Sequence, residues 1–328
     1  MVWGVIAASA VAVSAQPVPG DPYPPRHIEF AGGVMGFPDL VYQTLPGFRP
    51  LHLDLYRSGT GSDKTPLPLV VYVHGGGWSS GHTRQAGAFT NWPDVLAGLA
   101  ARGYVVASVE YRLSSEAPFP AAEQDIKAAI RWLRSHAGTY RIDRTRGLIW
   151  GASAGGQLAA LTATSCGVAA LEPVGAPGES DCVQGAVIWY GIFDFSRFPA
   201  QNEPDSAGTR YLGCQPSQCA AGVVAAASPI TYIKRDSPPM LLIHGRADQT
   251  VPVEQSQEMY DRLQAAGVPA QLLLLPDVDH SFIGKTPAAT RQASRAALAR
   301  VFDFIDATIG SRREPQRVKP KGTPTAGR

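Results

Sequence analysis

The sequence predicts an α/β fold with a mainly parallel central sheet flanked by helices. A series of short apolar runs indicates strands buried on both faces, because such strands carry little alternation of apolar and polar residues. Amphipathic stretches separate these runs; in DIKAAIRWLRSHA, the apolar residues Ile126, Ile130 and Leu133 share one helical face. Buried strands that alternate with amphipathic helices are typical of parallel α/β sheets. The runs are LPLVVYVHGGGW, YVVASVEY, LIWGAS, AVIWYG, MLLIHGRAD and AQLLLLPD.

Two segments depart from this alternation. Residues 27–57 include VYQTL and LHLDLYR, whose two-residue alternation predicts a pair of strands rather than helices. Residues 191–239 are rich in Gly, Pro, Ser and Cys, and we expect a small excursion above the sheet there. A helical stretch over residues 288–309 closes the pattern, so one α/β domain is predicted over residues 27–310.

The two ends of the chain are predicted to lie outside this domain. Residues 1–15, MVWGVIAASAVAVSA, form an apolar run that ends in small residues, as a secretory signal peptide does. This run is shorter than the ~20 residues that a transmembrane helix needs, so no membrane span is expected in the mature chain. Residues 16–26 form a Pro-rich lead, and the polar, basic residues 311–328 are expected to be a disordered tail. These features predict a secreted or periplasmic protein.

Composition limits the functional classes. The 328 residues are 45% hydrophobic and 17% charged, which is enough for the core of a large soluble domain. The formal net charge is +2, and the basic excess lies in the tail rather than along a helix face. A nucleic-acid partner is therefore not expected. No feature of the sequence sets the oligomeric state.

The four cysteines form an even set, which supports export to an oxidising compartment. Four cysteines allow three pairings, and the short loops between them favour Cys166 with Cys182 and Cys214 with Cys219. The alternative is a set of free, buried thiols. A zinc site is not expected, because the C-x4-C spacing of Cys214 and Cys219 has no second ligand pair. No other metal site is predicted.

The segment GASAGG, residues 151–156, carries the candidate nucleophile Ser153. It follows the apolar run LIW and precedes the helix-favouring run QLAALTAT, which is the strand-turn-helix setting of a nucleophile elbow. Gly151 and Gly155 would let the backbone turn sharply and expose the serine hydroxyl group. The N-terminus of the following helix would place partial positive charge beside a developing oxyanion. The alternative for this segment alone is a tightly packed helix start.

The segment His74-Gly75-Gly76-Gly77-Trp78, also at the end of a predicted strand, is the candidate oxyanion hole. Because glycines let backbone N–H groups approach a ligand closely, we expect Gly76, Gly77 and Ala154 to donate to a substrate oxygen. A turn that only reverses the chain is the alternative. His74 lies too early in the chain to be the base of such a site, and we expect it to order the loop.

Asp248 and His280 complete the candidate catalytic set. Each follows a predicted strand, and the chain order Ser, Asp, His is that of α/β hydrolases. His280 would take the serine proton, and Asp248 would fix the orientation of the histidine ring. The sequence also offers rivals. Asp194 is the runner-up acid, whereas His244 is expected to pack within a strand and Asp279 to point elsewhere.

The combination of HGGGW, GASAGG, ADQTVP and DHSF resembles serine esterases of the α/β-hydrolase superfamily. The segment EYRLSSEAPFPAAEQDIKAAIRWL is similar to one shared by hormone-sensitive-lipase-like carboxylesterases and by feruloyl and acetyl xylan esterases. The elbow has Ala152 where hormone-sensitive-lipase-like enzymes usually carry Asp, and residues 16–50 lack the pattern of their cap helices. The resemblance, which spans residues 51–309, therefore points towards feruloyl and acetyl xylan esterases.

This resemblance implies hydrolysis of carboxylic esters through an acyl-enzyme, without a metal or organic cofactor. The expected substrates are short-chain or aromatic esters, either small or linked to a polysaccharide or polyester. Trp78, Tyr190 and Phe193 are candidate substrate contacts, with core packing as the alternative for each. Alternatives of other classes are a serine peptidase, an amidase or formamidase, and a non-catalytic binding module on the same fold.

Overall fold

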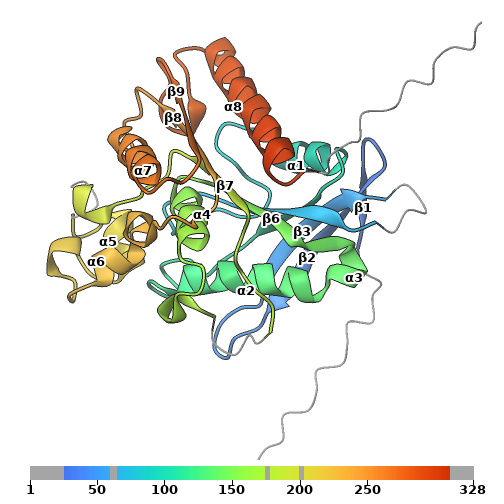
Figure 1. Cartoon of the computed structure of the whole chain (residues 1–328), viewed down its shortest axis with the longest axis horizontal. Coiled ribbons are helices and arrows are strands. Elements are labelled where there is room, and N and C mark those ends of the chain that lie inside the picture. The colour runs from blue at the N-terminus through green and yellow to red at the C-terminus, as the bar shows by residue number, and fades with distance from the viewer. Residues whose placement is uncertain (1–25, 60–64, 174–177, 199–202, 311–328) are drawn as a thin grey trace, which may run out of the picture.

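The computed structural model describes residues 26–59, 65–173, 178–198 and 203–310. Its centre is one nine-stranded sheet with the strand order β1-β2-β3-β5-β4-β6-β7-β8-β9, and Figure 1 shows this sheet crossing the middle of the molecule. The strands are β1 (Ile28–Phe30), β2 (Val34–Gln43), β3 (Leu51–Ser58), β4 (Leu67–Val73), β5 (Val105–Val109), β6 (Ile142–Ala152), β7 (Gly185–Trp189), β8 (Met240–Gly245) and β9 (Ala270–Leu275).

The larger part of the sheet is parallel. β5, β4, β6, β7, β8 and β9 each run parallel to their neighbours in this series. Every residue of β5, β7 and β8 is buried, as the continuous apolar runs predict. Because parallel strands end at the same edge of a sheet, the loops that follow β4, β6, β8 and β9 meet at that edge. The predicted mainly parallel α/β sheet is confirmed.

Helices cover both faces of the sheet, and each face has its own hydrophobic core. Successive residues of β4 point to opposite faces: Val70 packs with Leu96 of α1 and Val301 of α8, whereas Val71 shares a core with residues of α2, α4 and α7. Figure 1 shows α1 and α8 together on one side of the sheet. The helices are α1 (Trp92–Ala100), α2 (Ala121–Ser135), α3 (Ala137–Tyr140), α4 (Ala154–Thr164), α5 (Ala207–Leu212), α6 (Val223–Ala227), α7 (Glu254–Ala265) and α8 (Pro287–Thr308).

The N-terminal segment differs from the prediction in one respect. The sequence predicts two strands over residues 27–57, and the structure has three, because the short β1 precedes β2 and β3. β1 is only three residues long, too short to show an alternation of its own. β3 also pairs antiparallel with β5, so these strands extend the parallel sheet at one edge.

The excursion predicted over residues 191–239 lies between β7 and β8 and consists of short helices. Figure 1 shows α5 and α6 beyond α7, outside the sheet. The Cys214–Cys219 disulfide, which the sequence favours, lies in this segment. Tyr211 of α5 stacks on Trp78, with ring centroids 4.5 Å apart, and this contact ties the segment to the loop after β4. The 3-10 turns within it are Phe195–Arg197, Pro216–Gln218 and Pro229–Tyr232.

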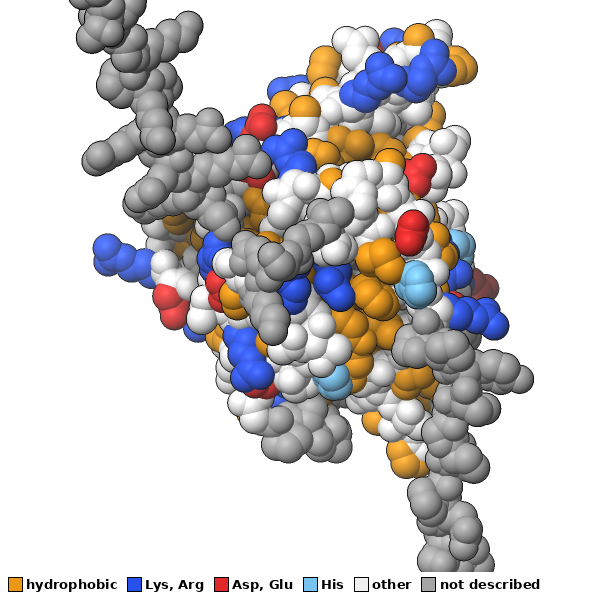
Figure 2. Space-filling view, turned by 90° about the vertical axis from the view of Figure 1, so that its right-hand side faces the viewer, with side chains coloured by type: hydrophobic (Ala, Val, Ile, Leu, Met, Phe, Trp, Pro, Cys, Tyr) orange, Lys and Arg blue, Asp and Glu red, His pale blue; other side chains and the backbone are white. Residues whose placement is uncertain are grey.

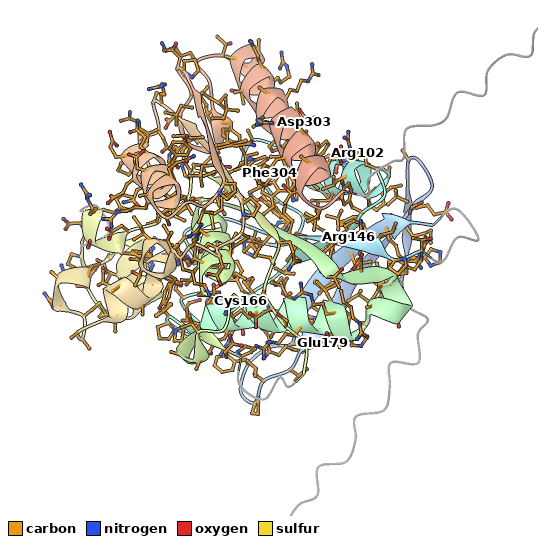
Figure 3. All side chains as sticks on the ribbon, in the orientation of Figure 1. Arg102, Arg146, Cys166, Glu179, Asp303 and Phe304 are labelled. Atoms are coloured by element: carbon orange, nitrogen blue, oxygen red, sulfur yellow. A yellow bond between two sulfur atoms is a disulfide. The ribbon has the colours of Figure 1, made fainter. Side chains whose placement is uncertain are left out.

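The second favoured disulfide, Cys166–Cys182, joins the end of α4 to the residues before β7. Figure 3 shows Cys166 beside α2. The α2 side chain of Lys127 is fully buried here and donates to the carbonyl oxygen of Ser165 at 2.9 Å. Its charge is balanced by Asp181, whose carboxylate lies 3.4 Å away. The short 3-10 turn Ala169–Leu171 follows Cys166.

The predictions for residues 1–15 and 311–328, and for nearly all of the lead at 16–26, fall outside the described residues. Among the described residues, none of the helices combines the length and the apolar composition that crossing a bilayer requires.

Candidate active site

Ser153 lies in the sharp turn between β6 and α4. Its backbone has φ 55° and ψ −122°, a conformation that residues with a Cβ atom rarely adopt. Such strain persists where the surrounding structure holds it in place, and its N–H donates to the carbonyl oxygen of Trp189 at 2.9 Å. The turn therefore presents the Ser153 side chain at the carboxyl edge of the sheet, as the sequence predicts for a nucleophile elbow.

The glycines beside Ser153 are explained by close backbone packing. A Cβ atom on Gly155 would overlap the carbonyl oxygens of Val73 and His74, because α4 begins directly against the end of β4. A Cβ atom on Gly151 would overlap the carbonyl group of Gly155. Gly151 and Gly155 are thus required by close packing within the elbow and between the elbow and the end of β4.

Three side chains from three loops form one hydrogen-bonded chain. Ser153 Oγ lies 3.0 Å from His280 Nε2, and His280 Nδ1 lies 2.8 Å from Asp248 Oδ2. The carboxylate accepts from Nδ1, so Nε2 is the acceptor for the serine hydroxyl group. The structure therefore brings together the three residues that the chain order predicts.

The Asp248 carboxylate is buried and held on both oxygens. Oδ1 accepts from the backbone N–H groups of Thr250 and Val251, each at 2.8 Å. Burial raises the pKa of this carboxyl group, but hydrogen bonds from His244 and His280 outweigh burial and hold the pKa well below its usual range. Asp248 therefore stays ionised throughout the range in which a histidine titrates.

His244 contributes more than the packing that the sequence predicts. Its ring is fully buried in β8, and Nε2 lies 3.1 Å from Asp248 Oδ2 and 3.0 Å from the carbonyl oxygen of Val251. Because both neighbours of Nε2 are acceptors, Nε2 carries a proton and donates. Nδ1 is hydrogen-bonded to Ser256 Oγ at 2.7 Å. The four-residue spacing between His244 and Asp248 was the only sequence signal for this contact.

The two rival carboxylates do not join the chain. Asp279 accepts from the backbone N–H groups of Gln249 and His280, at 2.8 and 2.7 Å, and so fastens the two loops to each other. Asp194 caps the 3-10 turn that follows it by accepting from Ser196. Asp279 does point away from His280 Nδ1, but the sequence did not predict that its carboxylate would hold the two loops together.

The glycine-rich loop after β4 has the backbone that the sequence predicts. Gly76 and Gly77 have φ values of 118° and 59°, in the region that favours glycine. Both residues line the same cavity as Ser153 and Ala154. His74 stacks on Tyr111 with centroids 4.5 Å apart, and its Nδ1 donates to the carbonyl oxygen of Gly75 at 2.8 Å.

Burial lowers the pKa of His74 to about 4. The ring is therefore neutral near pH 7. It orders the loop through the Gly75 hydrogen bond and the Tyr111 stack, in agreement with its predicted part in ordering the loop.

A cavity of about 390 Å³ lies beside Ser153 Oγ. Trp78 and Tyr190, two of the predicted substrate contacts, line it. Phe193 does not: its side chain is buried in the core below, so this prediction is corrected. The sequence also missed part of the wall. The missed lining residues include Ser80, Gln85, Ile192, Ala207, Thr250 and Val251.

Trp78 is fixed by its neighbours rather than free to move. Its Nε1–H donates to Gln157 Oε1 at 2.9 Å, and Gln157 Nε2 donates to the carbonyl oxygen of Ala227 at 2.8 Å. These bonds join the loop after β4 to α4 and to the excursion.

Within the described ranges, no group of three or more His, Cys, Asp or Glu side chains is arranged to hold a metal ion.

Comparison with known proteins gives one family. The sequence profile of the BD-FAE family matches residues 53–263, which is more than half of the chain. The chain is 31% identical over 260 residues to LipM, a probable carboxylic ester hydrolase of Mycobacterium tuberculosis; the match covers 77% of this chain and 59% of LipM. The chain spans about three fifths of the length of the curated relatives it matches.

Two solved structures share the fold. A truncated carbohydrate esterase from gut microbiota has a TM-score of 0.72 and 25% identity, over 86% of this chain and 99% of that one. A thermophilic esterase from the Planctomycetes species Thermogutta terrifontis, with propionate bound, has a TM-score of 0.69 and 26% identity, over 84% of this chain and 96% of that one. With the profile match, the fold and the arrangement around Ser153, these likenesses show that the chain belongs to the BD-FAE family of α/β hydrolases.

Proposed function

We propose that this protein is a serine carboxylesterase. The observation that carries the proposal is the unbroken hydrogen-bonded chain from Asp248 through His280 to Ser153, whose hydroxyl group faces a cavity of about 390 Å³. A serine hydroxyl is a weak nucleophile until a base accepts its proton, and this arrangement supplies that base. Esterases among the relatives support the same reaction.

In the proposed reaction, Ser153 Oγ attacks the carbonyl carbon of the ester and its proton passes to His280 Nε2. The tetrahedral intermediate collapses and expels the alcohol, which takes the proton from His280. A water molecule then attacks the acyl-enzyme and gives a proton to His280. Collapse of the second intermediate releases the carboxylic acid and returns the proton to Ser153. Asp248 stabilises the imidazolium that forms twice in the cycle.

The N–H groups of Gly76, Gly77 and Ala154 are the proposed oxyanion hole. All three residues line the cavity beside Ser153, and Ala154 is the first residue of α4. Its N–H lies in the first turn of the helix, where backbone donors have no partner within the helix. Each such donor contributes about 3 kcal/mol of transition-state stabilisation.

The size and lining of the cavity support the proposal that the substrates carry short acyl chains or small aromatic acids. Its wall combines apolar side chains of Ile192, Phe198 and Val251 with polar side chains of Ser80 and Gln85. The polar part would accept hydroxyl groups of a sugar, and the carbohydrate esterase from gut microbiota supports an acyl group on a carbohydrate as the natural ester. The structures of the Thermogutta terrifontis esterase with propionate and with butyrate support a short acyl chain.

We also propose that the protein works in a secreted or periplasmic setting. Two disulfides, Cys166–Cys182 and Cys214–Cys219, support this location because such bonds persist in oxidising compartments.

The esterase proposal is tested with p-nitrophenyl acetate and butyrate. Ser153→Ala should lose about three orders of magnitude or more in kcat, because the serine and its base act as a unit. Ser135→Ala, at the exposed end of α2, is the matched control and should keep the wild-type rate. Equal rates for wild type and Ser153→Ala would reject the proposal.

In a series of p-nitrophenyl esters, a maximum at acyl chains of about ten carbons or more would reject the short-chain preference.

A further inference from the structure

A groove next to the Ser153 cavity carries the inference. Its volume is about 590 Å³, larger than that of the cavity itself. It lies between residues 88–90, which continue the loop after β4, and the beginning of α8. A volume of this size is in the range of ligand sites in proteins. Its lining residues are Ala88, Phe89, Thr90, Ile283, Gly284, Lys285, Thr286, Pro287, Thr290, Arg291, Ser294 and Arg295.

The groove and the cavity are lined by successive parts of the same two loops. Gly87 and Ser281 line the cavity, while the next residues of the same two loops line the groove. The two loops meet at the boundary, where a Cβ atom on Gly87 would lie 3.1 Å from the Tyr190 hydroxyl oxygen and 3.3 Å from Ser281 Cβ. A polymeric substrate whose ester lies at Ser153 would cross these two loops to reach the groove.

The groove is positively charged. Its lining includes Lys285, Arg291 and Arg295 and no carboxylate. Lys285 pairs with Asp277 at 3.0 Å, but both side chains are largely exposed, so this pair neutralises little of the local potential. In the described part of the chain, no carboxylate pairs with Arg291 or Arg295. Figure 2 shows Lys and Arg side chains gathered at the top of the molecule, where Figure 1 places the beginning of α8.

The two arginines do not serve the stability of α8. They are spaced four residues apart on the helix, and like charges at this spacing are destabilising by a few tenths of a kcal/mol. The stability of α8 therefore gives no reason for two cations at these positions.

The floor of the groove is apolar. Ile283 is 45% exposed, and Phe89 stacks on Trp189 with ring centroids 5.8 Å apart. An apolar floor with a cationic rim fits a chain of sugar rings that bears carboxylates, because the ring faces pack on apolar side chains and the acids meet the arginines.

We propose that this groove is a binding subsite for the anionic part of the substrate, and that the protein prefers esters carried on an acidic polysaccharide. The inference rests on the proposed esterase function. The ester lies at Ser153 while a carboxylate on a neighbouring sugar unit lies against Arg291 and Arg295. The cavity beside Ser153 is lined by no Lys, Arg, Asp or Glu side chain, so the preference for negative charge comes from the groove.

The test compares O-acetylated polygalacturonate, which is acidic, with O-acetylated dextran, which is neutral. Acetate release by the full chain is measured for both polymers at low salt and at 0.5 M NaCl, a concentration that screens surface charges at about 4 Å. We expect wild type to favour the acidic polymer in kcat/KM by about tenfold or more at low salt, and this ratio to shrink in salt. Arg291→Gln with Arg295→Gln should bring the ratio close to one.

Arg300→Gln is the matched control, since Arg300 lies on the same helix outside the groove and should leave the ratio at its wild-type value. The inference is overturned if wild type releases acetate from both polymers at similar kcat/KM, or if the double variant keeps the wild-type ratio. Hydrolysis of p-nitrophenyl acetate distinguishes a failure of the groove inference from a failure of the esterase proposal. If this ester is cleaved without a preference between polymers, only the groove inference fails; if it is not cleaved, the esterase proposal fails.

Discussion

His244 Nε2 lies 3.1 Å from Asp248 Oδ2, the oxygen to which His280 donates at 2.8 Å. The Asp248 carboxylate thus sits between two imidazole rings, one fully buried in β8 and one beside Ser153. Its other oxygen is held by two backbone N–H groups. With both oxygens fixed, the carboxylate has one orientation, which determines the direction in which the His280 ring faces Ser153.

This relationship predicts that His244 positions Asp248. His244→Phe keeps a buried ring but removes the donor, and we expect kcat for p-nitrophenyl butyrate to fall about 10- to 100-fold, since a hydrogen bond to a charged group contributes about 1.5–3 kcal/mol. KM should change little, because His244 does not line the cavity. His244→Gln, whose amide can donate to Asp248, should recover much of the rate. An effect on KM alone would show that His244 does not act through Asp248.

The close packing around Gly155 predicts that the elbow does not tolerate an added methyl group at this position. Gly155→Ala places a Cβ atom against the backbone carbonyl oxygens of Val73, the last residue of β4, and of His74, which follows it. We expect a loss of stability of about 1–3 kcal/mol or more and a large loss of activity. Gly98→Ala is the matched control: Gly98 is exposed in α1 with open space around it, so alanine should stabilise by about 0.5–1 kcal/mol. Thermal and denaturant unfolding measure both changes.

The buried carboxyl group of Glu123 predicts that the free energy of unfolding depends on pH. Burial in α2 raises the pKa of its carboxyl group to about 8, against the lowering effects of Lys127 and of the hydrogen bond from Thr162. The folded state therefore binds a proton that the unfolded state releases near the ordinary value of 4.5. The stability that this proton provides is complete below pH 4.5 and is lost as the pH rises through about 8.

Glu123→Gln removes this titration while keeping an oxygen that accepts from Thr162. We expect its unfolding free energy, relative to wild type, to rise between about pH 5 and pH 8 by roughly 4 kcal/mol, or about 1.4 kcal/mol per pH unit, and to level off above that range. Glu254→Gln, at an exposed position on α7, should show no such trend. Denaturant unfolding at several pH values checks the prediction, and a constant difference between Glu123→Gln and wild type would contradict the raised pKa.

The two disulfides are predicted to differ in their effect on stability. Cys166 and Cys182 are 16 residues apart in sequence, whereas Cys214 and Cys219 are 5 apart, and a longer closed loop restricts the unfolded chain more. Replacing both members of a pair by Ala should cost about 3 kcal/mol for Cys166–Cys182 and about 2 kcal/mol for Cys214–Cys219. Unfolding of the two double variants under non-reducing conditions measures these values, and the opposite order would contradict the loop-length argument.

The sequence predicted the parts of this structure that depend on local pattern. The buried strands follow from their apolar runs, and the approach of Ser153, Asp248 and His280 follows from the parallel sheet, because a parallel sheet places the ends of its strands at one edge. Both disulfide pairings follow from short separations in the chain.

The remaining features depend on contacts between segments far apart in the chain. Gly155 of α4 contacts the end of β4, and Gln249 in the loop after β8 is hydrogen-bonded to Asp279 in the loop after β9. Each contact joins segments that are far apart in the chain, so it leaves no periodic signal. The direction of a side chain in an irregular loop is equally hidden. Phe193 points into the core and Phe198 towards the cavity, although both lie in the same aromatic segment after β7.

Ser153 and His280 are 127 positions apart in the chain, so a newly made chain must fold before they can meet. The two residues meet only after β7, β8 and β9 have all joined the sheet, and His280 follows the last of these strands. A partly assembled molecule in which β9 has not joined the sheet would therefore lack the proposed base beside Ser153, even when the elbow itself has formed. The proposed ester hydrolysis would therefore require completed assembly, and the recovery of turnover during refolding would time the docking of the final strand.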